Sequence, residues 1–115
     1  MHDNLINSSF KYCEGVAKGH YENFPVASLL IPKEKRKYVY AIYAFARAAD
    51  DFADEPGIEG GNPKRLVLID EWHEKLKDCY KGRAYDPIFI ALKQTVEDNG
   101  IPIEPLENLL KAFKQ

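Results

Sequence analysis

An uninterrupted run of helix-forming residues, residues 33–54, constrains this chain more than any other feature of its sequence. The run contains neither glycine nor proline and is rich in alanine, lysine, arginine and aromatic residues, which favours a single long helix. Pro32 stands immediately before the run, where the start of a helix tolerates proline. The sequence therefore predicts a long helix that begins near residue 33 and ends near residue 54.

The carboxyl-terminal end of this predicted helix carries three aspartates, Asp50, Asp51 and Asp54. The negative end of a helix dipole repels each carboxylate by about 0.3–1 kcal/mol, so a solvated helix end would more naturally carry lysine or arginine. The alternative is a plain acidic helix end that faces water. The unfavourable placement indicates instead that a positive group meets these aspartates.

The spacing of the polar residues places four of them on one face of the helix. At about 100° per residue, the four lie within roughly 60° of one another; they are Tyr43, Arg47, Asp50 and Asp54. Asp50 and Asp54 are one turn apart, and one or two carboxylates completed by substrate phosphates are the usual ligands of Mg²⁺. Arg47 is suitably placed for a phosphate or for Asp51, although a surface salt bridge would explain it too. Tyr43 adds an aromatic surface to this face, or belongs to the core.

Length and composition limit the classes of protein to consider. The chain has 115 residues, enough for one modest domain, and its net charge of −2 argues against general nucleic-acid binding. Cys13 and Cys79 form no metal or redox motif, so we expect reduced thiols in a cytoplasmic protein. The first ten residues lack the apolar segment of a signal peptide, and no stretch approaches the roughly 18 apolar residues of a membrane span. Peripheral contact with a membrane surface stays open.

The first third of the chain predicts one further helix. Ser8 or Ser9 is expected to cap a helix that ends near Lys18, with residues 1–7 lying outside it. The following connector, residues 20–32, is apolar and contains two prolines, which fit poorly with a full helix.

The second half of the chain predicts three more helices, so we expect an all-α fold. A loop with three glycines and two prolines, residues 55–63, precedes them, and Asp86 is expected to cap the middle one. Trp72 is expected to anchor the core and its neighbour His73 to be exposed. The helices are expected at residues 64–81, 87–98 and 106–115. The apolar stripe of the last helix still runs where the sequence stops, which predicts that further chain follows it.

Several of these segments together resemble the N-terminal part of the squalene/phytoene synthase family of head-to-head prenyl transferases. ENFPV at residues 22–26 and YAFARAADDFAD at residues 43–54 are similar to the bacterial squalene synthase branch of hopanoid pathways, the hydroxysqualene-synthase type. LLKAFKQ at residues 109–115 also resembles the next helix of that family. The resemblance covers most of the chain, and the motif around Asp50 is specific in this context.

The resemblance implies a terpenoid-synthase-type fold with a central cavity between two facing aspartate-rich helices. Residues 1–115 would form the N-terminal portion of this single domain, and the second aspartate-rich motif would lie beyond residue 115. In the family, magnesium ions bridge the aspartates and the diphosphate of farnesyl diphosphate, so that the allylic C–O bond can ionise. An apolar, aromatic-lined cavity shelters the resulting cation from water.

The resemblance also implies roles for individual residues. Asp50 and Asp54 would be the catalytic magnesium ligands, while Arg47 would contact diphosphate or fix an aspartate and Tyr43 would line the cavity. Asp51 would either help to bind the substrate or only pair with Arg47. The expected substrate contacts are His20, Phe24, Tyr43, Arg47 and Asp51.

Three functional hypotheses follow from the sequence. The first is a magnesium-dependent prenyl transferase that acts on farnesyl diphosphate or presqualene diphosphate, with the activity of the short chain alone left open. The second is a non-catalytic truncated homologue that binds isoprenoid diphosphate or a partner subunit. The third is a purely structural helical bundle. The sequence leaves open whether the product is squalene, hydroxysqualene or phytoene, whether NADPH is used, and which oligomeric state the protein adopts.

Overall fold

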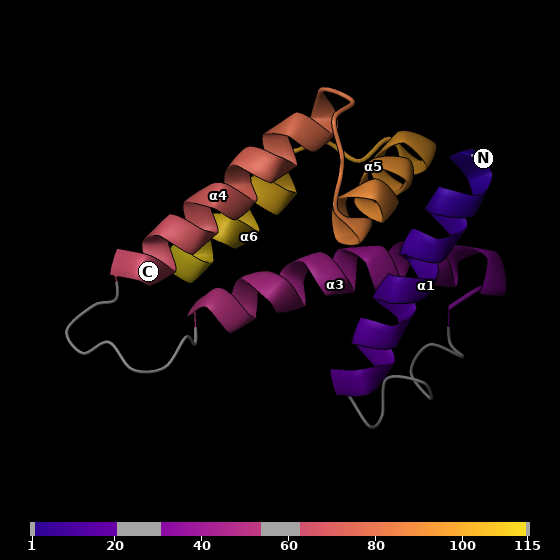
Figure 1. The fold of residues 1–115 in the computed structure, drawn as a ribbon, viewed down its shortest axis with the longest axis horizontal. Coiled ribbons are helices and arrows are strands. Elements are labelled where there is room, and N and C mark those ends of the chain that lie inside the picture. The colour runs from indigo at the N-terminus through magenta and orange to yellow at the C-terminus, as the bar shows by residue number, and fades with distance from the viewer. Residues whose placement is uncertain (1, 21–30, 54–62, 115) are drawn as a thin grey trace.

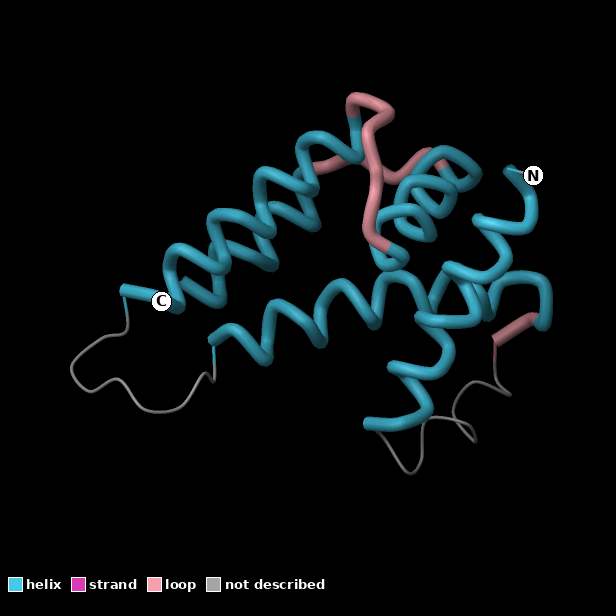
Figure 2. The backbone as a smooth tube through the Cα atoms, in the orientation of Figure 1, coloured by secondary structure: helices cyan, strands magenta, loops and turns pink. Residues whose placement is uncertain are grey.

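The computed structural model describes residues 2–20, 31–53 and 63–114, and all regular structure within these ranges is helical. Figures 1 and 2 show the helices in one orientation. In chain order they are α1 (His2–His20), the short 3₁₀ helix η1 (Lys33–Lys35), α3 (Arg36–Ala53), α4 (Pro63–Tyr80), α5 (Pro87–Asn99) and α6 (Glu104–Lys114). The expected all-α fold is confirmed.

Helix α3 is the centre of this arrangement, because α1, α4, α5 and α6 all pack against it. Figure 1 shows α3 in magenta, with α1 crossing one end and α4 and α6 running along the other. Three fully buried alanines on α3 let the neighbouring helices approach its backbone closely: Ala41, Ala44 and Ala49. The predicted long helix is thus confirmed, although its first turn is the 3₁₀ helix η1, which the backbone N–H of Lys35 closes by donating to the Pro32 carbonyl at 2.9 Å.

Aromatic rings from three helices form the part of the core that holds α4 and α5 against α3. Trp72 of α4 lies 4.6 Å from the ring of Phe89 on α5 and 5.3 Å from that of Phe52 on α3, in edge-to-face arrangements, measured between ring centroids. Phe45, fully buried on α3, stacks on the same indole at 6.1 Å. Such pairs contribute about 0.5–1.5 kcal/mol beyond the area that they bury. The expectation that Trp72 anchors the core is confirmed.

Helix α1 begins earlier than the sequence suggested. Residues 2–7 were expected to lie outside the helix, but α1 starts at His2. The hydroxyls of Ser8 and Ser9 do not cap a helix start, because both donate to the Leu5 carbonyl within the helix, at 3.0 and 2.8 Å. Tertiary packing explains the difference: α1 lies against α3 and α5, and Ile6 packs against the core.

A glycine follows the end of α4 and another follows the end of α5. Gly82 (φ +90°) follows α4, and Gly100 (φ +61°) ends α5 in the left-handed conformation. Asp86 occupies the position before α5 as expected, but its side chain makes no capping hydrogen bond. Its carboxylate instead accepts a hydrogen bond from Lys75 Nζ at 2.7 Å, so the ion pair with α4 replaces the expected cap.

No helix in the described part of the chain is both long enough and apolar enough to cross a lipid bilayer.

Candidate functional site

The acidic face of α3 lines an open pocket of about 230 Å³ together with one aromatic ring of α6. Tyr43, Arg47 and Asp50 are three of the four residues predicted to share this face, and they border the same pocket. Phe113 of α6 closes it from the opposite side. The predicted alignment along α3 therefore produces a real concave surface with a polar edge and an aromatic wall.

Arg47 is the positive group that the aspartates at this helix end meet. Its Nη1 lies 3.5 Å from Asp50 Oδ2, and its Nη2 lies 3.2 Å from Asp51 Oδ1. The last turn of α3 contains no basic residue of its own, so Arg47 from the preceding turn supplies the charge. Arg47 thus pairs with Asp51, one of the two partners that the sequence left open for it, and the same guanidinium also reaches Asp50.

This ion-pair cluster stays open to an incoming ligand. The side chains of Arg47, Asp50 and Asp51 are 31%, 40% and 52% exposed, so each contact contributes at most about 1 kcal/mol to stability. Arg47 Nε is buried and has no hydrogen-bond partner within the described residues. A guanidinium held by weak, exposed pairs can exchange a carboxylate for a phosphate oxygen at little cost.

The structure separates the two adjacent aspartates. Asp50 borders the pocket, whereas Asp51 is the more exposed of the two and does not contribute to the pocket wall. Asp50 is therefore placed to bind a metal ion together with a molecule in the pocket. Asp51 lies outside the pocket wall and pairs with Arg47 from there.

Three residues predicted from the sequence cannot be compared with this geometry. Asp54 and Phe24 lie outside the described residues, as does the ENFPV stretch. His20 ends α1, but the position of its side chain is likewise outside what the structure describes. The proposed pairing of Asp50 with Asp54 and the substrate contacts of His20 and Phe24 remain predictions.

Sequence reasoning missed Phe113 as a site residue. The residue was recognised only as part of the apolar stripe of the last helix, because periodicity shows which face of a helix is apolar but not which helix that face meets. The stripe on α6, which also contains the buried Leu106 and Leu110, meets α3 and α4 in the fold. This packing carries Phe113 to the acidic end of α3.

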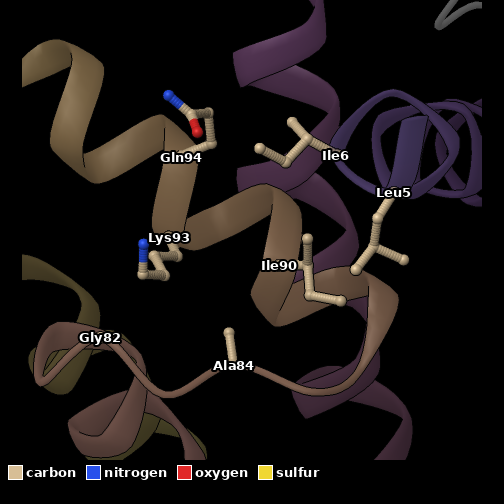
Figure 3. A pocket seen from close by; sticks show the side chains of 7 residues that line it. All are labelled: Leu5, Ile6, Gly82, Ala84, Ile90, Lys93 and Gln94. Atoms are coloured by element: carbon tan, nitrogen blue, oxygen red, sulfur yellow. The ribbon is translucent and has the colours of Figure 1, made fainter. Parts of the chain in front are cut away.

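A second pocket, of about 150 Å³, lies elsewhere, between the start of α1 and α5 (Figure 3). Its wall contains Leu5, Ile6 and Ile90, and none of the predicted site residues borders it. Its two polar side chains are already engaged within α5, since Lys93 pairs with Glu97 at 2.9 Å and Gln94 donates to Asp98 at 2.6 Å. We therefore place the candidate site at the pocket of α3 and α6.

The two cysteines are unsuited to nucleophilic catalysis. Both are buried and free, and burial raises the pKa of the Cys13 thiol to about 12. The pKa of Cys79 is also raised to about 12, first by desolvation, while Lys93 opposes the shift. The reactive species of cysteine is the thiolate, so neither side chain offers a nucleophile near neutral pH.

The described residues fit a magnesium site that a substrate completes, rather than a closed protein site. They contain no group of three or more His, Cys, Asp or Glu side chains close enough to hold a metal ion. Asp50 offers one accessible carboxylate at the edge of the pocket, and Mg²⁺ usually binds one or two carboxylates together with substrate phosphates and water. The donor chemistry at this site therefore suits a magnesium–diphosphate complex.

The helical packing is that of a terpenoid-synthase-type domain. The model of the family described as squalene/phytoene synthase matches residues 17–115. The chain therefore belongs to the squalene/phytoene synthase family, a family of prenyl-transferring enzymes, as the sequence motifs predicted.

Individual relatives agree with this assignment. The crystal structure of squalene synthase HpnC from Alicyclobacillus acidocaldarius superposes with a TM-score of 0.85 at 34% identity, and the match covers 95% of this chain. The chloroplastic phytoene synthase of Daucus carota is 31% identical over 111 residues, which are 96% of this chain. Phytoene synthase 2 of Oryza sativa subsp. japonica is 30% identical over 110 residues, also 96% of this chain.

The matches cover only part of each relative. The chain spans 27% of the carrot and rice proteins and 40% of the solved squalene synthase chain. The comparison therefore defines the family and the fold of this chain.

Proposed function

We propose that this chain provides the first aspartate-rich helix of a magnesium-dependent head-to-head prenyl transferase that acts on farnesyl diphosphate or presqualene diphosphate in isoprenoid biosynthesis. The observation that carries the proposal is the pocket that Tyr43, Arg47 and Asp50 of α3 share with Phe113 of α6. It combines the two features that a prenyl diphosphate requires, a charged edge for the diphosphate and an aromatic wall for the hydrocarbon.

The charged edge provides for binding the leaving group. Arg47 donates hydrogen bonds to diphosphate oxygens once its weak contacts with Asp50 and Asp51 are exchanged. Asp50, together with Asp54, would hold a magnesium ion at this edge. The ion would supply the positive charge that a leaving diphosphate needs.

The aromatic wall protects the reacting carbon. Tyr43 and Phe113 exclude water from the inner side of the pocket, and the faces of their rings favour a positive charge near them. His20 and Phe24 are proposed as further substrate contacts.

A squalene or hydroxysqualene product is favoured over phytoene by the ENFPV stretch at residues 22–26 and by the 34% identity with the Alicyclobacillus squalene synthase. The phytoene alternative is supported by the 31% identity with the carrot phytoene synthase. Comparing the affinity for farnesyl diphosphate with that for the next longer prenyl diphosphate distinguishes the two, because the preferred chain length reflects the hydrocarbon wall.

A second candidate function is binding without turnover, in which the protein holds isoprenoid diphosphate or pairs with a partner subunit. It is supported by the open pocket of α3 and α6, where Arg47 and Asp50 offer a diphosphate site whether or not turnover follows. This candidate predicts magnesium-dependent binding of farnesyl diphosphate but no release of diphosphate, whereas the prenyl transferase releases diphosphate.

Isothermal titration calorimetry with farnesyl diphosphate, with and without MgCl₂, tests the binding that both candidates require, and an assay of released diphosphate separates them. Asp50→Asn is expected to weaken the magnesium-dependent affinity at least about tenfold, since interactions with charged groups contribute about 1.5–3 kcal/mol. Asp51→Asn is the matched control on the adjacent residue, and a much smaller effect is expected because Asp51 lies outside the pocket wall. Equal effects of the two substitutions, or tight binding without magnesium, would contradict the proposed site.

A further inference from the structure

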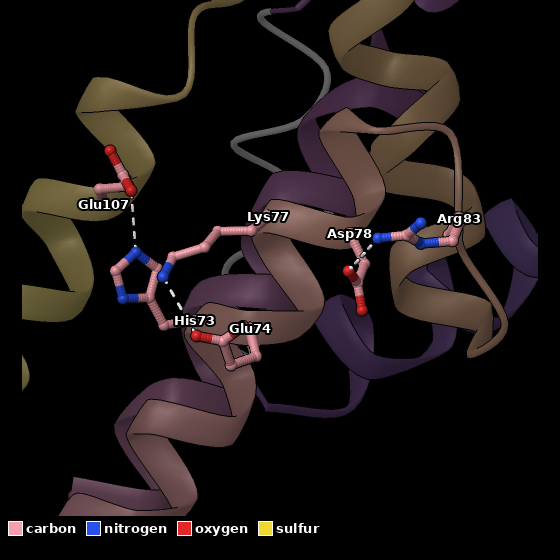
Figure 4. A network of polar contacts seen from close by, with 6 residues as sticks. All are labelled: His73, Glu74, Lys77, Asp78, Arg83 and Glu107. Carbon is pink, nitrogen blue, oxygen red and sulfur yellow. Dashed lines mark hydrogen bonds and ion pairs between the residues drawn. The ribbon is translucent and has the colours of Figure 1, made fainter.

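A polar contact joins α4 to α6, the helix that carries Phe113, and has no role in the function proposed above. His73 Nε2 of α4 lies 2.8 Å from Glu107 Oε2 of α6 (Figure 4). The side chains are only 20% and 25% exposed. An ionised carboxylate only accepts hydrogen bonds, so the imidazole donates. The sequence-based expectation of an exposed His73 was wrong, because its exposure depends on where α6 packs.

This contact joins α4 to the helix that carries the aromatic wall. Helix α6 packs against α3 and α4, and α4 and α6 lie side by side in Figure 1. Glu107 and Phe113 are six residues apart on α6, which separates their directions by about 120° around the helix. Glu107 therefore faces α4 while Phe113 faces the pocket on α3.

A second contact holds the start of the same helix. Tyr80 Oη of α4 donates to the carbonyl of Ile101, in the turn before α6, at 3.0 Å. His73 and Tyr80 are seven residues, or about two turns, apart and so lie on one side of α4. Two polar contacts on one side of α4 therefore join it to α6 and to the turn before α6.

The charged neighbours favour an ionised Glu107. The hydrogen bond from His73 lowers the pKa of Glu107 most, and Lys111 and Lys77 contribute to the same shift. Lys77 is itself paired with Glu74 at 3.1 Å on the same face of α4. Glu104, in the first turn of α6, is the other acid close to this contact, since its charge acts on Tyr80 together with that of Glu107.

We propose that His73 is a positioning residue, which holds Phe113 at the distance from Asp50 and Arg47 that a prenyl chain requires. The inference rests on the proposed function, since it concerns the hydrocarbon wall of the same pocket. His73 would touch neither substrate nor metal. Without His73, α6 would shift. Phe113 would then move relative to the pocket, while Arg47 and Asp50 of α3 would stay in position.

The two halves of the pocket can be tested separately with two ligands. Inorganic pyrophosphate with Mg²⁺ has no hydrocarbon and needs only the polar edge on α3. Farnesyl diphosphate with Mg²⁺ needs the edge and the wall. His73→Ala is expected to weaken farnesyl diphosphate binding about three- to tenfold, the range typical of substitutions that act without touching the ligand. The affinity for pyrophosphate is expected to stay within twofold, on the order of the error of such titrations.

Two further variants make the result specific. His73→Gln retains a donor for Glu107 and is expected to restore most of the lost affinity. Glu107→Ala should produce the same selective loss as His73→Ala, and the double variant should be little worse than either, because both remove one contact. Glu107→Ala also keeps the test valid if His73→Ala does not fold. Lys75→Ala is the matched control: it breaks another ion pair of α4, with Asp86, away from the pocket, and should bind both ligands normally.

The outcomes separate this inference from the proposed function. Selective loss of farnesyl diphosphate binding, rescued by His73→Gln, supports the positioning role. Unchanged binding in both His73→Ala and Glu107→Ala overturns it while leaving the proposed function intact. Equal loss of both ligands also overturns it, because the whole site would then depend on the contact. If the wild-type protein binds neither ligand, the proposed function itself is wrong and this inference with it.

Discussion

The indole Nε1 of Trp72 donates a hydrogen bond to the backbone carbonyl of Phe45 at 3.3 Å, in the buried interface between α4 and α3. A carbonyl inside a helix normally accepts only the N–H four residues later, so this bond uses its second lone pair. The next residue, His73, contacts Glu107 on α6. Two consecutive side chains of α4 therefore hold it to two different helices, one by a buried contact and one by a half-buried contact.

Replacing Trp72 by phenylalanine tests the buried contact. Trp72→Phe removes the indole donor and part of the ring that packs on Phe45, Phe52 and Phe89, so we expect the free energy of unfolding to fall by about 1–3 kcal/mol. Urea unfolding is followed by far-ultraviolet circular dichroism and not by tryptophan fluorescence, because Trp72 is the only tryptophan and the variant lacks it. Val67→Ala, on the exposed side of α4, should change stability by no more than about 0.5 kcal/mol. Similar effects of the two substitutions would contradict the role of Trp72.

Two glycines offer a test of backbone conformation with opposite expected signs. Gly100 has a left-handed φ of +61°, so Gly100→Ala is expected to destabilise the protein by about 1 kcal/mol. Gly15 lies inside α1 with nothing within 4 Å of an added Cβ, so Gly15→Ala is expected to stabilise it by about 0.5–1 kcal/mol. Thermal or urea unfolding of both variants measures the two changes. A stabilising Gly100→Ala would show that α5 does not need this ending.

The sequence predicted the parts of the fold that depend on local chemistry. Long stretches without glycine or proline became α3 and α4, and Gly82 and Gly100 follow helices as expected. The alignment of Tyr43 with Arg47 and Asp50 was also predictable, since it follows from helix geometry alone. These features need no knowledge of which helix packs against which.

The features that sequence reasoning missed depend on tertiary packing. Residues 2–7 are polar enough to predict an irregular terminus, yet they are helical because α1 packs on two other helices. Asp86 was expected to cap α5, but its carboxylate instead accepts a hydrogen bond from Lys75 of α4. Phe113 and His73 gain their roles only from where α6 lies. Single-helix periodicity carries no information about such partners.

Burial of the two thiols predicts slow alkylation. A pKa of about 12, against an ordinary value of 9.0, leaves roughly a thousandfold less thiolate at pH 8 for Cys13 and Cys79. We expect iodoacetamide to modify neither residue in the folded protein within the time that modifies both in urea. Mass spectrometry of the timed reactions measures this. Rapid labelling of either cysteine without urea would contradict the packing of α1 or α4.

The pH dependence of stability tests the contact between His73 and Glu107 without any ligand. The hydrogen bond from His73 lowers the pKa of Glu107 below its ordinary value of 4.5, so the ionised carboxylate favours the folded state. This contribution is complete above the unfolded pKa and disappears as the pH falls through the lower folded pKa. Glu107→Gln cannot ionise, so its urea midpoint should fall less than that of the wild type between about pH 5 and pH 3.

Glu74→Gln, a 69% exposed position on α4, is the control and should follow the wild-type curve. Parallel curves for Glu107→Gln and the wild type would mean that the contact adds no stability in solution, and α6 would then be held by its apolar stripe and by the Tyr80 hydrogen bond to Ile101.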